Sequence, residues 1–312
     1  MNAADIALAY KEASKLEKPT NHSFLYYGPP KSGKTELVAT LAKSAEYDRI
    51  YWFDIEKGFA TFLRMYKDGK LSLDDLKKIE VIDIPDTRED PVAVETLLKT
   101  LCSKHNEVLI CEDHGRVNCE ACKKAGKGGT KFKYSSLTKK CAVVIDSLSQ
   151  VGTSALNLAC KGKPSEYKPT FDEYGACGKW LSDICTVLQA AQFCDIHAIT
   201  HVQILEDENK NDIYYPLCGT KAFSANVAKF FGTVVFVTKK LKRHRAESST
   251  LTSMNTLSGS RLGIELEKDT ELDLPKALRK AGFFRPIEGE ETEAEAPATE
   301  SKPASTGRFG RK

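Results

Sequence analysis

Eight consecutive residues have the types and the spacing of a phosphate-binding loop. They are Gly28, Pro29, Pro30, Lys31, Ser32, Gly33, Lys34 and Thr35, and they match the full P-loop pattern. Glycines allow backbone amides to turn inward around phosphates, and a helix that follows directs its positive end at the same anion. Lys34 would reach the β- and γ-phosphates of a nucleotide, and the Thr35 hydroxyl would bind Mg²⁺. A glycine-rich turn that matches by chance is the alternative, but an apolar run precedes the loop and a helical pattern follows it.

A P-loop site also needs an acidic residue at the end of a neighbouring buried strand, to hold the magnesium ion through water. Asp146 has this position, directly after the apolar run 141–145, although it could simply cap the strand end. Hydrolysis needs a further group that activates water. Glu56, in Asp54-Ile55-Glu56 after the run 49–53, is the candidate, with an ordinary surface acid as the alternative.

Polar residues follow the apolar run 196–200 as well. Thr200, His201 and Gln203 stand where a side chain could sense whether the γ-phosphate is present. We therefore take Thr200 and His201, together with Lys34 and Glu56, as the candidate catalytic residues. For His201, a hydrogen-bonded histidine at a strand end is the competing interpretation.

Four residues between 111 and 122 have the spacing of a zinc site. Cys111, His114, Cys119 and Cys122 form two close pairs that could surround one tetrahedral Zn²⁺. Four protein ligands leave no open position, so such a site would be structural. Reduced thiols without a metal are the alternative, and Cys102 with His105 could replace one pair. The remaining widely spaced cysteines are predicted to be buried side chains: Cys160, Cys177, Cys185, Cys194 and Cys218.

Two basic clusters could contact nucleic acid. Seven lysines between 123 and 140 surround Phe132 and Tyr134. Lysine side chains can bind the phosphate backbone and aromatic rings can stack on unpaired bases, so this segment suits single-stranded DNA. The second cluster, 239–245, follows an apolar run in what we expect to be a loop. A solvated charge run is the alternative for each cluster. Neither has a base-reading pattern, so any DNA binding should tolerate many sequences.

Apolar runs alternate with helical patterns along most of the chain. Strands are predicted at 24–27, 49–53, 79–84, 141–145, 196–200 and 233–238, and helices at 4–15, 35–42, 91–101, 171–191 and 224–231. The run 141–145 is apolar throughout, which is typical of a strand buried on both faces. This alternation predicts a doubly wound α/β fold, with a mostly parallel twisted sheet and helices on both faces.

The chain divides into four predicted parts. They are an N-terminal helix within 1–22, the α/β core at 23–286, a Cys- and Lys-rich, zinc-ribbon-like insertion at 103–140, and a tail at 287–312. The insertion looks separate from the packed core. The tail is rich in glutamate and almost lacks apolar residues, so burial cannot offset its ordering entropy and we expect disorder. A solvated tail is the simpler interpretation, and an interaction tail is the alternative.

The composition excludes several classes of protein. The 312 residues are 41% hydrophobic, with 46 Lys and Arg against 43 Asp and Glu, which excludes a fibrous or wholly disordered chain. No run approaches the roughly 18 apolar residues that cross a bilayer, and no signal-peptide pattern is present. We therefore expect no membrane partner. Ten cysteines without such a signal favour reduced thiols or metal ligands in the cytoplasm.

The order of these motifs resembles the RecA-like P-loop ATPases, especially the small phage-encoded members associated with single-strand annealing and recombination. The resemblance covers residues 23–279 without the insertion, and its specific elements are 28–35, 54–56, 144–147 and 200–203. Residues 219–221, 234–238 and 261–263 are further points of similarity.

The resemblance implies a RecA-like ATPase core whose nucleotide lies between the subunits of a homo-oligomer. Lys221 and Arg261 are then candidates for acting across the subunit interface. Single-stranded DNA is the implied partner, and a single-strand binding protein is a further candidate. If the chain is phage-encoded, its location is the bacterial host cytoplasm.

These observations together predict an ATP hydrolase that binds single-stranded DNA and is stimulated by it, in phage DNA recombination, annealing or replication. The expected cofactors are ATP, Mg²⁺ and a structural Zn²⁺. The main alternative is a non-catalytic, nucleotide-dependent binding module that recruits a partner protein through its zinc insertion. A small-molecule kinase is a second alternative, but the arginine-rich lid that it would need is not recognisable.

Overall fold

The computed structural model describes residues 21–103, 105–206, 208–240, 243–248, 255–264 and 273–285. The helix predicted at 4–15 and the disorder predicted for 287–312 lie outside these residues. Within the described part of the chain, every helix is too short or too polar to span a bilayer.

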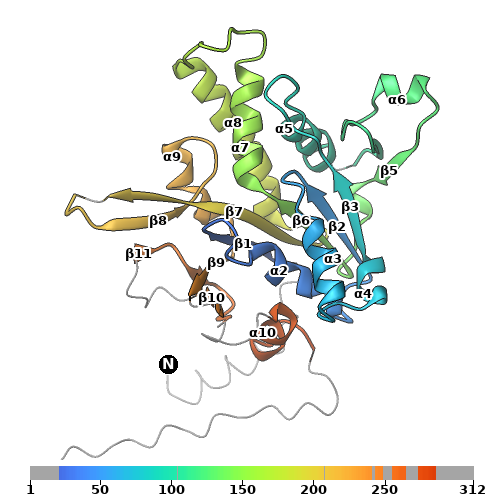
Figure 1. Cartoon of the computed structure of the whole chain (residues 1–312), viewed down its shortest axis with the longest axis vertical. Helices are drawn as coiled ribbons and strands as arrows, with labels where there is room; N and C mark the ends of the chain where they lie inside the picture. The colour runs from blue at the N-terminus through green and yellow to red at the C-terminus, as the bar shows by residue number, and fades with distance from the viewer. Residues whose placement is uncertain are drawn as a thin grey trace, which may run out of the picture.

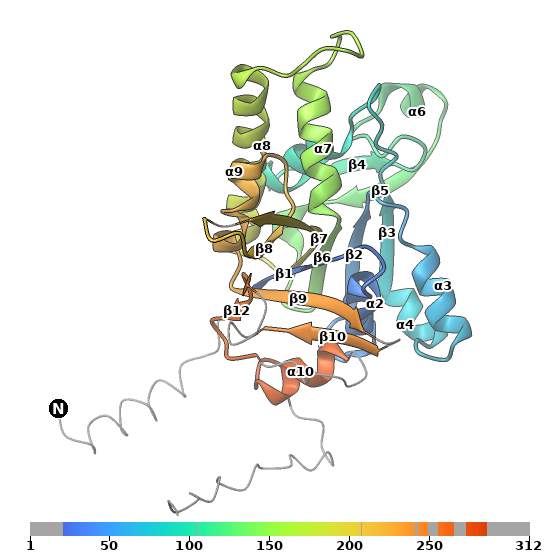
Figure 2. The same cartoon turned by 60° about the vertical axis from the view of Figure 1, so that its left-hand side comes forward.

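One sheet organises the chain (Figures 1 and 2). Parallel strands stand in the order β9-β1-β7-β6-β2-β3, and β10 pairs antiparallel with β9 at one edge. Their bounds are Ser23–Gly28 (β1), Arg49–Asp54 (β2), Ile79–Asp83 (β3), Cys141–Asp146 (β6), Asp195–Glu206 (β7), Thr233–Lys240 (β9) and Arg243–Glu247 (β10). An antiparallel β8 (Asp212–Pro216) extends from β7, and the short β11 (Asn255–Thr256) and β12 (Gly259–Ser260) pair with β8 and β9. The predicted mostly parallel α/β sheet is confirmed.

Helices cover both faces of this sheet. One face carries α5 (Ala93–Leu97), α7 (Leu148–Ala159) and α8 (Phe171–Ala190), and the other carries α2 (Lys34–Ala39), α3 (Ala60–Lys67), α4 (Leu73–Lys78) and α10 (Leu274–Lys280). Alternate residues of each strand enter opposite cores: in β1, Leu25 and Tyr27 join one, and Phe24 and Tyr26 join the other. Burial on both faces explains why the central strands are apolar without alternation.

Some elements differ from the prediction because local side chains start helices where periodicity is weak. The helix predicted at 224–231 is a short α9 (Lys221–Ser224) and a 3-10 turn, Val227–Phe230, because the Thr220 hydroxyl caps the Phe223 amide. The unpredicted α7 begins after Ser147, whose hydroxyl accepts from the Gln150 amide. The expected loop at 239–245 is instead the β9–β10 hairpin.

Part of the insertion belongs to the main core, contrary to the prediction. Its hairpin of β4 (Val108–Cys111) and β5 (Gly129–Phe132) carries Phe132 and Tyr134, each 1% exposed. The Phe132 ring meets Tyr51 and Phe53 of β2 edge-on, with centroids 5.3 and 5.4 Å apart. These two aromatic rings cover the sheet, so the prediction that they stack on DNA bases is wrong. Only the remainder of the insertion, around α6 (Glu120–Lys124), projects from the fold (Figure 1).

Truncating the Phe132 side chain should therefore act on stability. Phe132→Ala leaves a cavity against β2, and we expect the free energy of unfolding to fall by about 3–5 kcal/mol in urea denaturation. Lys131→Ala, an exposed change on the same strand, is the control and should cost little. Equal stability of the two variants would contradict the packing described here.

Candidate functional site

The loop between β1 and α2 has a conformation that depends on its two outer glycines. Gly28 ends β1, and a Cβ atom on it would lie 1.9 Å from the Val237 carbonyl oxygen of β9. Gly33 has a φ of 98°, and a Cβ atom there would lie 2.5 Å from the His244 ring. Both positions exclude a side chain, so the fold itself requires these glycines.

Pro29, Pro30, Lys31 and Ser32 form the tight turn between the glycines. The Ser32 amide donates to the Pro29 carbonyl at 3.3 Å, and Lys31 adopts a φ of 60°. Ser32 is 2% exposed, and its Oγ has no hydrogen-bond partner among the described residues. A buried hydroxyl in this state costs free energy until a ligand or water satisfies it. The loop therefore fits a polar ligand.

Lys34 begins α2 and turns back into the loop. Its Nζ donates to the carbonyl oxygens of Gly28 at 2.9 Å and Pro29 at 2.8 Å. Burial lowers the pKa of Lys34 to about 8, while the charges of Asp146 and Glu56 act in the opposite direction. A charged phosphate oxygen is a stronger acceptor than a carbonyl oxygen. The ammonium group can therefore give up its bonds to the two carbonyl oxygens and donate to a phosphate instead.

Thr35 and Asp146 meet at the same edge of the sheet. Thr35 Oγ1 donates to Asp146 Oδ2 at 3.0 Å, and Asp146 is buried at the end of β6. Burial, followed by the nearby charge of Glu56, raises the pKa of Asp146 to about 7. A Cβ atom on Gly58 would lie only 3.2 Å from Asp146 Oδ2, so the glycine keeps this position uncrowded. A hydroxyl and a carboxylate side by side form a donor set that suits Mg²⁺.

Asp54 shapes the turn after β2, a role that the sequence analysis missed. Its buried carboxylate accepts hydrogen bonds from the amides of Gly58 at 2.8 Å and Phe59 at 3.0 Å. These bonds fix the turn that carries Glu56. Aspartate favours such bonds to nearby backbone amides, but nothing in the sequence separates this role from that of the other strand-end acids.

Glu56 and His201, which are far apart in the sequence, meet at this site. Glu56 Oε1 lies 3.1 Å from His201 Nε2 and also accepts a hydrogen bond from Ser147 Oγ. Burial raises the pKa of Glu56, but the bonds from His201 and Ser147 outweigh it and leave the pKa below its usual value. The carboxylate is therefore ionised near neutral pH.

Thr200 has a different environment from the one predicted. It is fully buried, donates to the Leu217 carbonyl oxygen and lies 3.1 Å from Ser149 Oγ. The hydroxyl already has protein partners on both sides, and the sensing role of Thr200 stays a prediction. Ser147 and Ser149, which the sequence analysis missed, connect this residue to Glu56. Two serines at the start of a helix are too common to have indicated this role.

The four predicted metal ligands converge. The ligand atoms of Cys111, His114, Cys119 and Cys122 all lie within 4.8 Å of one another. His114 Nδ1 lies 3.2, 3.6 and 3.9 Å from the sulfurs of Cys122, Cys119 and Cys111. Ligands at the usual zinc distances of about 2.0–2.3 Å would have similar separations around one tetrahedral ion. The exposed Cys102 is not part of this cluster, so its pairing with His105 is not supported.

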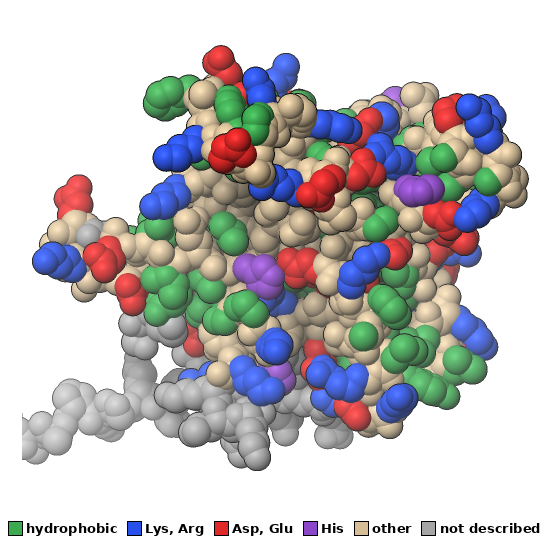
Figure 3. All heavy atoms as spheres, turned by 45° about the horizontal axis from the view of Figure 1, so that its top comes forward, with side chains coloured by type: hydrophobic (Ala, Val, Ile, Leu, Met, Phe, Trp, Pro, Cys, Tyr) green, Lys and Arg blue, Asp and Glu red, His purple; other side chains and the backbone are tan. Residues whose placement is uncertain are grey.

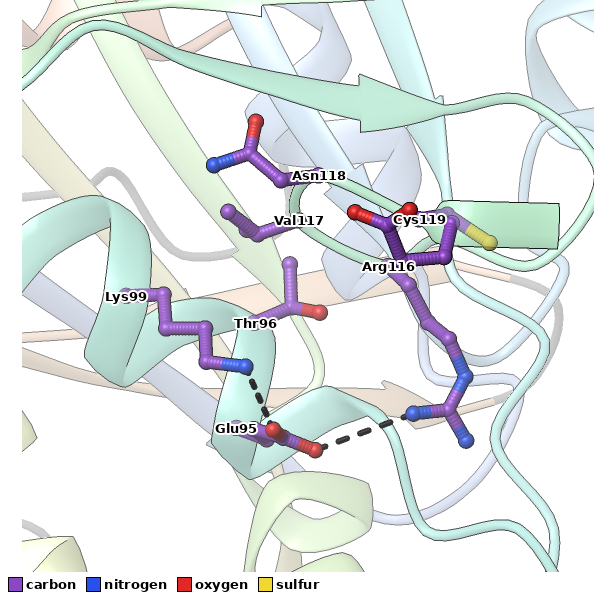
Figure 4. Close-up of a pocket in the computed structure, with 8 residues that line it drawn as sticks. Glu95, Thr96, Lys99, Arg116, Val117, Asn118 and Cys119 are labelled. Carbon is purple, nitrogen blue, oxygen red and sulfur yellow. Dashed lines mark hydrogen bonds and ion pairs between the residues drawn. The ribbon is translucent and has the colours of Figure 1, made fainter. Parts of the chain in front are cut away.

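A small pocket of about 190 Å³ separates this cluster from α5 (Figure 4). Glu95 forms ion pairs with Lys99 at 2.5 Å and Arg116 at 3.8 Å across it. These three charges in the lining of the pocket therefore pair with one another. The Cys119 sulfur points away from Lys99 and Glu95.

Lys221 and Arg261 lie on separate elements. Lys221 is exposed at the start of α9, whereas the Arg261 amide binds the Gly232 carbonyl beside the amino end of β9. Lys34 follows the opposite, carboxyl end of β1, which runs parallel to β9. Their action across a subunit interface stays a prediction.

Comparisons with solved structures gave matches of low similarity, of which three are described here. A prototypical ATPase from the type III secretion system of pathogenic bacteria has 16% identity and a TM-score of 0.40, over 84% of this chain and 61% of that one. The RadB recombinase has 14% identity and a TM-score of 0.36, over 72% and 79%. The assembled ATPase EscN from enteropathogenic E. coli has 15% identity and a TM-score of 0.41, over 84% and 52%. At these TM-scores we draw no conclusion from them.

A search of curated proteins gave no match. The family described as "AAA domain" (AAA_24) matches residues 20–262, which include the P-loop, Glu56, Asp146 and His201. That match covers more than half of the chain and agrees with the P-loop geometry described above. The chain therefore belongs to the AAA_24 family of AAA domains and has a mostly parallel P-loop α/β fold.

Proposed function

We propose that the protein hydrolyses ATP with Mg²⁺ and that its homo-oligomer acts on single-stranded DNA in phage recombination, annealing or replication. The observation that carries the proposal is the convergence of three groups at one edge of the sheet. Lys34 lies in the loop, Asp146 beside Thr35, and Glu56 beside His201. Such a set provides for phosphate binding, metal binding and water activation together.

In this mechanism each residue has a separate task. Lys34 and the loop amides neutralise the phosphates. Thr35 and Asp146 would hold Mg²⁺, which supplies positive charge to the β- and γ-phosphate oxygens when bound. Glu56 orients the attacking water and accepts its proton, and the hydrogen bond from His201 fixes the carboxylate in position.

The substitution Glu56→Gln separates an enzyme from a nucleotide-dependent binding module. Glutamine keeps the size of the side chain but cannot accept the water proton, so we expect ATP affinity to remain and turnover to fall by about 10²–10⁴-fold. Phosphate release and binding of a fluorescent ATP analogue measure the two effects. The control is Glu107→Gln, an exposed glutamate in the insertion. Equal turnover in both variants would exclude Glu56 as the catalytic base. Nucleotide binding without turnover in the wild type would leave the binding module as the better proposal.

The tip of the α7–α8 helical hairpin supports an interaction with single-stranded DNA. Phe171 is 95% exposed there, and Lys163 Nζ lies 5.1 Å from the Tyr167 ring. Lys161 and Lys168 are exposed in the same loop. Figure 3 shows hydrophobic and basic side chains mixed with acidic ones at this tip. Exposed rings beside lysines can stack on bases and track phosphates, the task assigned from sequence to Phe132 and Tyr134.

Removal of the Phe171 ring should weaken DNA binding without a loss of stability. We expect Phe171→Ala to cost about 1–3 kcal/mol of binding free energy for an oligo(dT), measured by fluorescence anisotropy at low salt. Tyr66→Ala is the matched control, because Tyr66 is a half-exposed aromatic residue on α3. Identical affinities of the two variants would exclude this tip as the contact, and no binding by the wild type would exclude the DNA proposal.

We further propose that the cysteine cluster binds a structural Zn²⁺ through three thiolates and the His114 imidazole. Cys111 ends β4 and Cys122 lies in α6, so the ion would join two separate elements of the insertion.

Metal analysis of the purified protein tests this site. About one zinc ion per chain is expected, because four ligands close a single tetrahedral site. The double variant Cys119→Ser, Cys122→Ser should lose the ion, while Cys102→Ser should keep it. Zinc retained in the double variant, or absent from the wild type, would contradict the assignment.

A further inference from the structure

A continuous series of hydroxyl groups runs from Glu56 into the protein interior. Ser147 Oγ contacts Glu56 Oε1 and lies 3.1 Å from Ser149 Oγ. Ser149 Oγ lies 3.1 Å from Thr200 Oγ1, which contacts the Leu217 carbonyl oxygen. Four oxygen–oxygen contacts therefore connect the carboxylate with a backbone carbonyl, through three hydroxyl groups on α7 and β7 and at the end of β6. All three hydroxyl-bearing residues are buried.

The number of available protons makes this series unusual. Each hydroxyl group carries one proton to donate. A carbonyl oxygen and an ionised carboxylate only accept, so both ends of the series take protons and neither supplies one. Three protons cannot fill four contacts. While Glu56 is ionised, one contact lacks a hydrogen bond, although the backbone amides of Gln150 and His201 still donate to Ser147 Oγ and Ser149 Oγ.

A proton on Glu56 completes the series. Glu56 can then donate to Ser147, Ser147 to Ser149, Ser149 to Thr200, and Thr200 to the Leu217 carbonyl. Four protons fill four contacts in one direction, and every hydroxyl oxygen keeps a lone pair for its remaining donor. His201 Nε2 can still donate to Glu56 Oε1 in this state. The buried network therefore gains one hydrogen bond when the carboxylate takes up a proton.

We infer that Ser147, Ser149 and Thr200 position Glu56 as the proton acceptor. The hydrogen bond from Ser147 holds the ionised carboxylate at Oε1, and the hydroxyl series has a proton for every contact once Oε1 carries the proton that Glu56 has taken from the attacking water. The inference rests on the proposed ATP hydrolysis. In that step water loses a proton to Glu56, the resulting hydroxide oxygen bonds to the γ-phosphorus, and the bond from that phosphorus to ADP breaks. In this proposal the hydroxyl groups act through Glu56, the one member of the series that accepts the proton.

Thr200 provides the sharpest test, because valine has its shape without the hydroxyl group. Thr200→Val interrupts the series, and we expect kcat for ATP to fall about tenfold, the order of one lost hydrogen bond, with unchanged affinity for a non-hydrolysable ATP analogue. Thr200→Ser retains the hydroxyl and should restore kcat. Thr186→Val is the matched control, since its hydroxyl bonds only locally, to the Ser182 carbonyl on the exposed side of α8. Ser149→Ala interrupts the series elsewhere and should reproduce the loss.

The outcomes are distinct. A lower kcat in Thr200→Val and Ser149→Ala, with unchanged nucleotide affinity and rescue by serine at 200, supports the inference. Wild-type kcat in both variants would overturn it, as would a parallel loss of nucleotide affinity or a serine variant as slow as valine. Thermal unfolding of each variant confirms that folded proteins are compared. If the wild type itself releases no phosphate, the proposed hydrolysis fails; if only the hydroxyl variants behave like wild type, the inference fails alone.

Discussion

The structure depends on the parallel pairing that brings the carboxyl ends of β1, β2 and β6 to one edge of the sheet, beside His201 in the middle of β7. β7 lies between β1 and β6, and β2 pairs with β6 on its other side. The ends of β1, β2 and β6 and the middle of β7 carry the residues of the site, and only this pairing brings them together. Because strand ends are fixed by ladders of backbone hydrogen bonds, the site inherits the rigidity of the core.

Acidic groups outnumber basic groups at this edge of the sheet. Asp54, Glu56 and Asp146 are acidic groups near a single buried ammonium group, that of Lys34. Burial raises the pKa of Asp54 and that of Asp146, and nearby negative charge adds to it, from Asp83 in the first case and from Glu56 and Asp54 in the second. A divalent cation would offset this negative charge, and a triphosphate would in turn balance the cation and Lys34. Nucleotide and metal are therefore expected to stabilise the site together.

The insertion combines two functions that are usually found in separate modules. Its hairpin supplies Phe132 and Tyr134 to the main core, and its tip holds the cysteine cluster. The two parts adjoin at Gly115, whose φ of 60° lets it approach the Ile84 backbone just beyond β3. A closed metal site would stiffen the tip, while the aromatic anchor fixes it to the sheet next to the strand that carries Glu56.

The sequence by itself determined the α/β class, the P-loop, the strand-end acids and the grouping of the cysteines with His114, because those features are encoded in short spacings and local periodicity. It did not distinguish the fully buried Thr200 from His201 at the site, or buried Phe132 from exposed Phe171. These differences follow from which strands pair and which faces helices cover, and such contacts join residues far apart in the chain. Tertiary structure alone therefore decided which polar groups meet Glu56 and which aromatic rings remain free for a partner.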